Sequence, residues 1–336
     1  MVTITDISKA CGVSRATVSK ALNGAPDIAA ETAERIRECA RSLGYLPNAT
    51  ARALKVGRSN NIGVIFSDST GGGLSHEYFS SILESVKLEA ERLGYDITFI
   101  SKSFGASAMD YYEHAKYRSC DGVVVASADF ADPAIMRLCT GDIPTVTLDY
   151  VYDSRTAIIS DNVRGMEELV KYVASRGHRR IAFIHGEMTS VTQKRLASFK
   201  KICASLGIAV PPEYVRQAVY HDPRSSGLAT RELLALGERP TCILYPDDFS
   251  FIGGMNELEK HGVSIPRDMS VAGYDGIHLS QVLRPRLTTY RQGAERMGKE
   301  AARLLIEQIE HPETWLPQQV LVEGELLPGD TVANID

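Results

Sequence analysis

The chain has 336 residues, 44% of them hydrophobic and 24% charged, and its 37 basic and 42 acidic side chains give a formal net charge of −5. This length exceeds one ordinary domain of roughly 100–200 residues, so we expect two or three domains. The composition excludes a disordered chain, a collagen and a small disulfide scaffold.

Targeting and metal-binding signals are not evident in the sequence. No apolar run approaches the ~20 residues of a membrane helix, and the N-terminus has no basic region leading into an apolar stretch. The six cysteines are scattered, with no CxxC pair and no histidine at metal-ligand spacing. We therefore expect a cytoplasmic protein without a membrane span, with reduced, buried thiols, no metal and no cofactor.

Charge is unevenly distributed along the chain. Residues 1–60 hold nine basic and five acidic side chains, a net charge of +4, which leaves 28 basic and 37 acidic side chains, a net charge of −9, for the remainder. Such asymmetry indicates that the two parts meet different partners.

The first part is predicted to form three short helices. Thr5 is expected to cap the first helix, and Gly12 is expected to end it at a turn. Ser14 is a good cap for a second helix over Ser14–Leu22, and apolar spacing predicts a third over Glu31–Leu43. Three such helices with a glycine in the first turn are typical of a helix-turn-helix.

The outer face of the second helix suits the major groove of DNA. Arg15 and Lys20 can donate to guanine O6 and N7, and methyl groups can touch thymine. The serine and threonine hydroxyls suit phosphate oxygens. The expected DNA-binding residues here are Thr5, Ser14, Arg15, Ala16, Thr17, Ser19, Lys20 and Asn23. The alternative is a helical protein-interaction bundle with a solvated face.

A short basic segment, Leu46–Gly57, follows the third helix. It is too short to be a stable helix alone, since isolated helices below ~12–15 residues are marginal in water. Leu54 can act as a minor-groove wedge if the helix folds only with DNA and a second copy present. We therefore add Asn48, Arg52 and Leu54 to the expected DNA-binding residues. The alternative is a plain interdomain linker.

Val2–Ser8, Gly12–Asn23, Leu43–Ala49 and Arg52–Leu54 together resemble the LacI/GalR family of bacterial transcription regulators. The resemblance continues through most of the chain, with landmarks at Val271–Asp275 and Leu287–Gln292. It implies that Arg15, Ala16 and Lys20 read bases and that Leu54 intercalates. It also implies a homodimer, or a higher oligomer, on a pseudo-palindromic double-stranded DNA operator.

After residue 60, apolar runs alternate with helical stretches. Predicted strands are Ile62–Phe66, Ile97–Ile100, Gly122–Ala126 and Pro144–Leu148, then Arg180–Ile184, Thr241–Leu244 and Met269–Tyr274. Predicted helices are Phe79–Leu93, Ala106–Arg118, Pro133–Thr140, Gly165–Arg176, Lys194–Leu206, Gly227–Leu236 and Phe249–His261. The alternation predicts an α/β fold of parallel sheets covered by helices, and two series predict two lobes with a ligand between them.

The family resemblance implies a core like a periplasmic sugar-binding protein, whose chain crosses three times between lobes. We accordingly expect a helix-turn-helix domain at 1–46, a hinge helix or linker at 47–59, a core N-lobe at 60–160 and 291–320, and a core C-lobe at 161–290 and 321–336.

Polar residues at strand ends are the candidates for holding an effector. The expected strand-end contacts are Asp68, Asp149, Asp247 and Asp275, joined by Arg195 at the opening of a helix. Carboxylates and a guanidinium together suit a hydroxyl-rich ligand. By resemblance, Arg195, Asp247 and Asp275 match effector contacts, Asp149 matches one used by some members, and Asp161 starts the second lobe. The alternative for each is a cap or an interlobe hydrogen bond.

Two positions depart from the family pattern. Asp247-Asp248 replaces the usual Asn-Asp pair and is expected to add a negative charge, and Asp222 replaces a stacking aromatic, for which Tyr220 or His221 can substitute. Tyr78 and Phe79 are further candidates, as apolar walls beyond the glycine-rich loop Ser69–His76. An acidic site disfavours anions, so a neutral sugar or polyol, or an amine-bearing ligand, is expected.

Catalytic motifs are absent from the sequence: there is no GxSxG, no HExxH and no plausible Cys-His pair. We therefore expect an effector-controlled transcription repressor and no enzyme. The alternative is a two-lobed sugar-binding protein or enzyme without a regulatory role.

Overall fold

A computed structural model describes residues 2–46, 53, 57–67, 73–104 and 107–335. The chain forms two compact units, Met1–Ser59 and Asn60–Asp336, here called the headpiece and the core. Among the described helices, none combines the length and apolar character needed to cross a bilayer.

The headpiece is built from α1 (Ile4–Cys11), α2 (Arg15–Leu22) and α3 (Ala30–Ser42). Gly12 ends α1 in a left-handed conformation with φ of 66°, which a residue with a Cβ seldom adopts. The three helices enclose a small apolar core of Ile7, Val18, Ala21, Ala33, Ile36 and Ala40.

Two details of the headpiece prediction are wrong. The residue before α1 is Thr3, whose N–H and hydroxyl both donate to Asp6, at 2.9 and 2.7 Å, whereas Thr5 lies inside the helix. Leu43, expected as the last residue of the third helix, instead follows the end of α3 at Ser42 and is 39% exposed.

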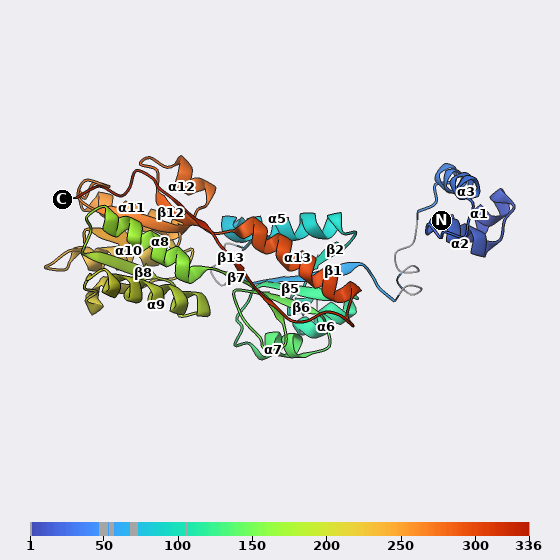
Figure 1. Ribbon diagram of the computed structural model, residues 1–336, viewed down its shortest axis with the longest axis horizontal. Coiled ribbons are helices and arrows are strands. Elements are labelled where there is room, and N and C mark those ends of the chain that lie inside the picture. Colours follow the sequence, from blue (N-terminus) through green and yellow to red (C-terminus); the bar gives the residue numbers. More distant parts are fainter. Residues whose placement is uncertain (1, 47–52, 54–56, 68–72, 105–106, 336) are drawn as a thin grey trace. The chain divides into compact units, whose positions relative to one another are not determined.

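Two sheets form the core, and both are mainly parallel (Figure 1). The first has the order β13-β7-β6-β5-β1-β2, and the second has the order β14-β12-β11-β10-β8-β9, in which only β14 runs antiparallel to its neighbour among the described strands. First-sheet strands are β1 (Asn61–Phe66), β2 (Asp96–Phe99), β5 (Gly122–Ser127), β6 (Thr145–Leu148), β7 (Thr156–Ser160) and β13 (Gln319–Val322). Second-sheet strands are β8 (Ile181–His185), β9 (Val215–Gln217), β10 (Cys242–Leu244), β11 (Ser270–Asp275), β12 (Thr288–Arg291) and β14 (Glu325–Leu327).

Helices cover both faces of each sheet. In the N-lobe, α5 (Glu77–Arg92) and α13 (Ala294–Glu310) pack together on one face, and α6 (Tyr111–Tyr117) and α7 (Pro133–Thr140) cover the other (Figure 1). In the C-lobe, α8 (Asn162–Ser175) and α9 (Ser190–Ser205) lie opposite α10 (Pro223–Leu234) and α11 (Asp248–Lys260). The short α12 (His278–Val282) follows β11. The expected α/β fold with two parallel-sheet lobes is confirmed.

The chain passes between the sheets after β7, after β12 and after β13. The expected boundary at residue 320 is therefore wrong, because it cuts through β13, whose last residue, Val322, still pairs with Ser160 of the first sheet. The expected boundary at 290 is also one residue early, since Arg291 pairs with Asp275.

The segment before α6 differs from its prediction. Instead of one helix over Ala106–Arg118, the short strands β3 (Ser103–Phe104) and β4 (Ser107–Ala108) pair, and α6 begins only at Tyr111. Asp110 fixes this start, because its carboxylate accepts from the Glu113 N–H at 2.8 Å while the Glu113 carboxylate accepts from the Asp110 N–H at 3.2 Å.

Candidate functional site

The outer face of α2 presents the predicted base-reading side chains to solvent. Ser14 caps the helix, its hydroxyl accepting from the Thr17 N–H at 3.0 Å. Arg15 is exposed and makes no hydrogen bond or ion pair with the described part of the chain. Lys20, in contrast, forms an ion pair with Asp27 in the loop that follows. On this face, Arg15 therefore has no ion-pair partner among the described residues, whereas Lys20 is paired with Asp27.

Of the other predicted headpiece residues, some stabilise the ends of helices or lie within them, and others fall outside the described residues. The Asn23 side-chain amide donates to the Ser19 carbonyl at 2.7 Å and so helps to end α2. Thr5 is half-buried within α1. Asn48, Arg52 and Leu54 fall outside the described residues.

Arg195 is the centre of a buried polar group at the lobe boundary. It is only 3% exposed and lies in the second turn of α9, not at its opening. Its Nε donates to the Asn162 side-chain oxygen at 2.7 Å, and its Nη1 donates to the Pro246 carbonyl at 3.1 Å. The guanidinium carbon lies 3.6 Å from the centroid of the Tyr274 ring, which is within cation–π range.

Two carboxyl groups lie close enough to Arg195 to interact with it electrostatically. Asp275 ends β11 and accepts from the Gln292 side-chain amide at 2.6 Å. Burial raises the pKa of Asp275 to about 7, and Arg195 opposes that rise. Burial also raises the pKa of Asp149, although its carboxylate accepts from the Ser160 N–H at 2.7 Å. These two carboxyl groups and Arg195 form the interlobe polar site.

Asp149 also links the two lobes through its backbone. The Ser190 hydroxyl at the start of α9 donates to the Asp149 carbonyl oxygen at 2.9 Å. Asp149 adopts a positive φ of 54°, which turns the chain at the end of β6. The polar site is thus continuous with an interlobe hydrogen bond.

Asp247 and Asp248 have hydrogen-bond partners of their own, and Asp247 is near enough to Asp275 to help raise the pKa of that carboxyl group. Asp247 caps α11, accepting from the Ser250 N–H and hydroxyl at 2.7 Å each and from the His221 N–H at 2.9 Å. Asp248 accepts from the Thr289 hydroxyl at 2.6 Å and the Ile277 N–H at 3.0 Å. Burial raises the pKa of Asp248 well above its ordinary value, which disfavours its charged form.

Two further predicted contacts have structural roles. Asp222 caps α10 through the N–H groups of Arg224 and Ser225, at 3.0 and 3.2 Å. Asp161 caps α8 through the Arg164 N–H at 3.0 Å. Asp161 thus shows the cap expected as its alternative, and Asp222 caps the helix that begins where an aromatic was expected. Asp68 lies outside the described residues.

Aromatic rings supply further contacts between the lobes. The His221 ring stacks on His76 at 3.9 Å and on Phe249 at 4.1 Å, and His76 meets Phe79 at 4.9 Å. Tyr220 points elsewhere, its hydroxyl pairing with Thr192 at 2.8 Å and its ring lying 6.0 Å from the Arg195 guanidinium. Asp222 occupies the position where relatives have a stacking aromatic residue. The two residues before it both carry rings: His221 stacks between His76 and Phe249, and Tyr220 lies near Arg195.

Tyr78 belongs to the interior of the N-lobe. It is 7% exposed, and its hydroxyl lies 3.3 Å from that of Ser160. Burial raises its pKa well above the ordinary value. Tyr78 of α5 therefore lies behind the polar site, beside Ser160, whose N–H donates to Asp149.

Asn162, Tyr274 and Gln292 complete the polar site, and the sequence assigned them no role. Tyr274 and Gln292 lie within the family landmarks Val271–Asp275 and Leu287–Gln292, and Asn162 follows Asp161 directly. The motifs include these positions, but only the folded chain shows that Asn162 and Tyr274 contact Arg195 and that Gln292 donates to Asp275.

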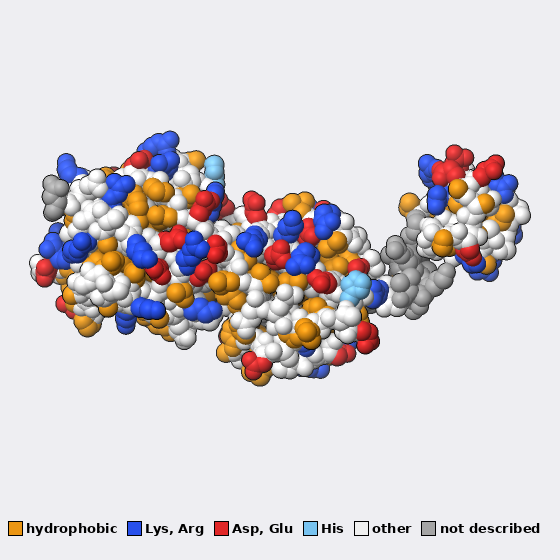
Figure 2. All heavy atoms as spheres, viewed as in Figure 1, with side chains coloured by type: hydrophobic (Ala, Val, Ile, Leu, Met, Phe, Trp, Pro, Cys, Tyr) orange, Lys and Arg blue, Asp and Glu red, His pale blue; other side chains and the backbone are white. Residues whose placement is uncertain are grey.

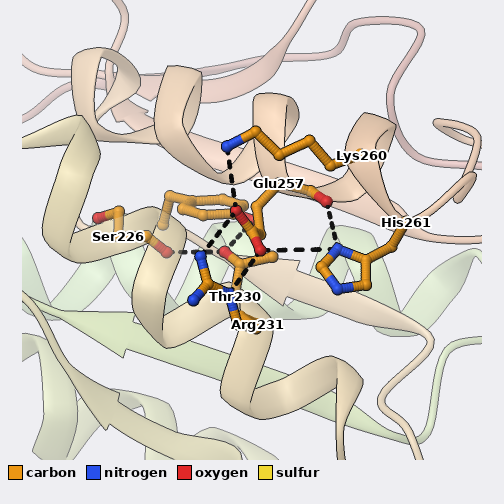
Figure 3. Close-up of polar contacts among 7 residues, drawn as sticks. Ser226, Thr230, Arg231, Glu257, Lys260 and His261 are labelled. Atoms are coloured by element: carbon orange, nitrogen blue, oxygen red, sulfur yellow. Dashed lines mark hydrogen bonds and ion pairs between the residues drawn. The ribbon is translucent and has the colours of Figure 1, made fainter.

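A second polar cluster joins α10 to α11, away from the interlobe polar site (Figure 3). The buried Glu257 carboxylate accepts from Arg231 Nε at 2.7 Å and also lies near Lys260 and His261, at 3.5 and 3.6 Å. The hydrogen bond from Arg231, together with the charge of Lys260, lowers the pKa of Glu257. A groove of about 400 Å³ runs beside the cluster, lined by Pro223, Arg224, Gly227, Leu228, Arg231, Gly253, Asn256, Glu257 and Lys260.

Charged side chains of both signs are interspersed over the core on the face seen in Figure 2. In the core, ion pairs such as Arg164 with Glu323, at 2.7 Å, join side chains of opposite charge. The face drawn in Figure 2 therefore shows no large patch of Lys and Arg side chains of the kind that binds DNA phosphates.

Comparison with known proteins assigns both units. Residues 3–48 match the model of bacterial regulatory proteins of the lacI family, and residues 170–332 match the periplasmic binding protein-like domain. The chain is 32% identical over 339 residues to the probable HTH-type transcriptional repressor ExuR of Bacillus subtilis, covering 100% of this chain and 99% of that protein. It is 30% identical over 341 residues to the transcriptional repressor PurR of Vibrio cholerae, with 100% and 99% covered.

A solved structure extends the similarity to the whole fold. The lac repressor dimer bound to operator and the anti-inducer ONPF shares 26% identity with this chain, with a TM-score of 0.83 and 99% of each chain covered.

Proposed function

Because this chain belongs to the LacI family of bacterial regulatory proteins, we propose that a small effector bound at the interlobe polar site controls how tightly its headpiece binds an operator. The chain is a DNA-binding transcriptional repressor of that family and not an enzyme. We place it in the cytoplasm as a homodimer on a pseudo-palindromic operator. The structural likeness to the lac repressor dimer supports this arrangement.

The effector we propose is a neutral, hydroxyl-rich molecule such as a sugar or polyol. The observation that carries this is the chemistry around Arg195, where one buried guanidinium lies near Asp149 and Asp275. Guanidinium N–H groups donate and carboxyl oxygens accept, so hydroxyl groups can bond to both. Once either carboxyl group is ionised, its charge offsets that of Arg195 and leaves no excess positive charge for an anion such as a sugar phosphate.

The lobes contact each other beside this site, which supports coupling to DNA. The His76–His221 stack and the Ser190–Asp149 hydrogen bond both join the N-lobe to the C-lobe. An effector that changes these contacts changes the relative position of the lobes and, in a dimer, the pairing of the segments 47–59. A ligand must favour one state ~10⁴-fold to move the population from 1:99 to 99:1.

A thermal-shift screen of sugars, polyols, amines and sugar phosphates on the full chain tests the effector class. We expect stabilisation by a neutral polyhydroxy compound, because a ligand that binds the folded state raises its stability. An operator-binding assay with the hit then shows whether it releases DNA or promotes binding. Tight binding of a phosphorylated sugar, with no response to neutral sugars, would contradict the proposal.

Leu54→Ala tests the proposed hinge. We expect weaker operator binding with unchanged effector affinity, since a minor-groove wedge contacts DNA alone. Loss of effector binding in this variant would show that Leu54 acts on the core instead.

A further inference from the structure

Lys20 and Asp27 form an ion pair on the face of α2 that is proposed to meet DNA. Lys20 lies in the last turn of α2, and Asp27 lies in the loop between α2 and α3. Both side chains are about half-exposed, at 51% and 55%, so neither is needed to fill the core. The pair therefore sits where a DNA phosphate or base would compete for the same ammonium group.

The loop that carries Asp27 is anchored at both sides of it. The Ala25 N–H donates to the Lys20 carbonyl at 3.0 Å, and Ile28 packs against the headpiece core. These contacts hold the backbone on both sides of Asp27, at the point where its carboxylate pairs with Lys20. The hydrogen bond from Lys20 lowers the pKa of Asp27, so the carboxylate stays charged at neutral pH.

Arg15 gives the contrast on the same face. It has no partner among the described residues, so its guanidinium is available to any phosphate. Lys20 is not, because its charge is already neutralised by Asp27. A phosphate can bind Lys20 only by displacing Asp27, and it gains a contact that carries no sequence information. A guanine edge presents two acceptors, O6 and N7, at a fixed position, so it competes better with Asp27 for the ammonium group.

We propose that Asp27 is a positioning residue for DNA recognition, which holds Lys20 away from backbone phosphates and so lowers the affinity for non-operator DNA. This rests on the proposed function, in which α2 faces the operator. The carboxylate thereby raises the ratio of operator to non-operator affinity without touching a base.

The test is the salt dependence of binding to a duplex of random sequence, measured with the full chain for wild type and Asp27→Asn. Freeing one cation for one phosphate steepens the slope of log affinity against log salt by about 0.9. We therefore expect Asp27→Asn to bind this duplex more tightly at low salt. Its advantage over wild type should shrink about threefold when salt is raised about fourfold.

Glu31→Gln is the matched control, because Glu31 is an exposed acid of the same headpiece with no ion pair in the described chain. It changes net charge equally without releasing Lys20, so its slope should stay at the wild-type value. Asp27→Glu should restore the pair and the wild-type slope. In a Lys20→Ala background, Asp27→Asn should have no further effect on the slope.

Two outcomes would overturn the inference: equal behaviour of Asp27→Asn and Glu31→Gln, or an Asp27→Asn effect that persists without Lys20. Either result leaves the proposed function standing, provided that wild type binds DNA. Failure of the wild-type chain to bind any duplex would instead contradict the proposed function.

Discussion

The Arg195 guanidinium carbon lies over the Tyr274 ring, 3.6 Å from its centroid, while Nε donates to the Asn162 side-chain oxygen and Nη1 donates to the Pro246 carbonyl. Its Nη2 makes no hydrogen bond to any described residue. The ring and two neutral acceptors thus fix the plane of the guanidinium while one of its nitrogens remains available. An arginine so held is preorganised to donate to a ligand.

Replacing Arg195 by Lys tests this preorganisation. We expect effector affinity to fall about 10- to 100-fold, because a hydrogen bond to a charged group is worth roughly 1.5–3 kcal/mol and lysine cannot keep the planar geometry. Calorimetric titration with the hit from the screen measures the change, and DNA binding without effector should persist. Unchanged effector affinity would remove Arg195 from the site.

Effector binding should depend on pH through Asp275, whose pKa burial raises to about 7. If the ionised carboxylate accepts from ligand hydroxyls, affinity rises as pH increases through 7 and falls up to about tenfold per pH unit below it. Titrations at pH 6, 7 and 8 check this. Asp275→Asn should flatten the profile, and a wild-type profile that is already flat would contradict the role.

Asp248→Asn is expected to stabilise the core at neutral pH. Burial raises the Asp248 pKa well above its unfolded value of 3.8, so the folded state binds the extra proton. Its contribution to stability is therefore fully present below that unfolded value and is lost as pH rises through the folded pKa. Asparagine cannot ionise, and its side-chain oxygen can accept from the Ile277 N–H while its amide donates to the Thr289 hydroxyl oxygen.

Urea unfolding of Asp248→Asn and wild type, followed from pH 4 to pH 8, measures this difference. The advantage of the variant should widen as pH rises. The exposed Asp153→Asn serves as control and should follow wild type. A constant difference across the range would show that Asp248 does not titrate in this way.

Gly165 of α8 is required by close packing against two tyrosines. A Cβ added there would lie 2.2 Å from the Tyr274 hydroxyl oxygen and 2.6 Å from a carbon of the Tyr290 ring. We expect Gly165→Ala to lower the free energy of unfolding by roughly 1–3 kcal/mol, the usual cost of overpacking. Gly237→Ala, where no atom lies within 4 Å of the added Cβ, is the matched control for chemical denaturation.

Arg15→Ala should relax operator specificity. The loss of a direct base contact is expected to cost roughly 1–3 kcal/mol at one base pair, so the variant should tolerate changes there that wild type rejects. Binding to an operator selected from random duplexes, and to its single-base variants, measures this. Arg35→Ala on α3 is the control, and uniform weakening of all sequences by Arg15→Ala would assign the residue to a phosphate.

The sequence by itself located many elements of this fold, although it missed the strands β7, β9, β12, β13 and β14 and the helices α12 and α13. Periodic apolar spacing located the others, because a helix must bury one stripe and a buried parallel strand must be apolar throughout. It located Ser14 as a cap and Gly12 as a turn, since those roles depend on neighbouring backbone groups alone. It also divided the charge between a basic headpiece and an acidic core.

Tertiary structure decided which polar residues have partners. Asp161, Asp222, Asp247 and Asp275 all end strands or begin helices, and no local pattern distinguishes them. Only the fold shows that Asp161, Asp222 and Asp247 cap helices, whereas Asp275 lies within electrostatic reach of Arg195. The reason is that burial and partners at distant positions, not residue type, set the charge and the hydrogen bonds of a carboxyl group.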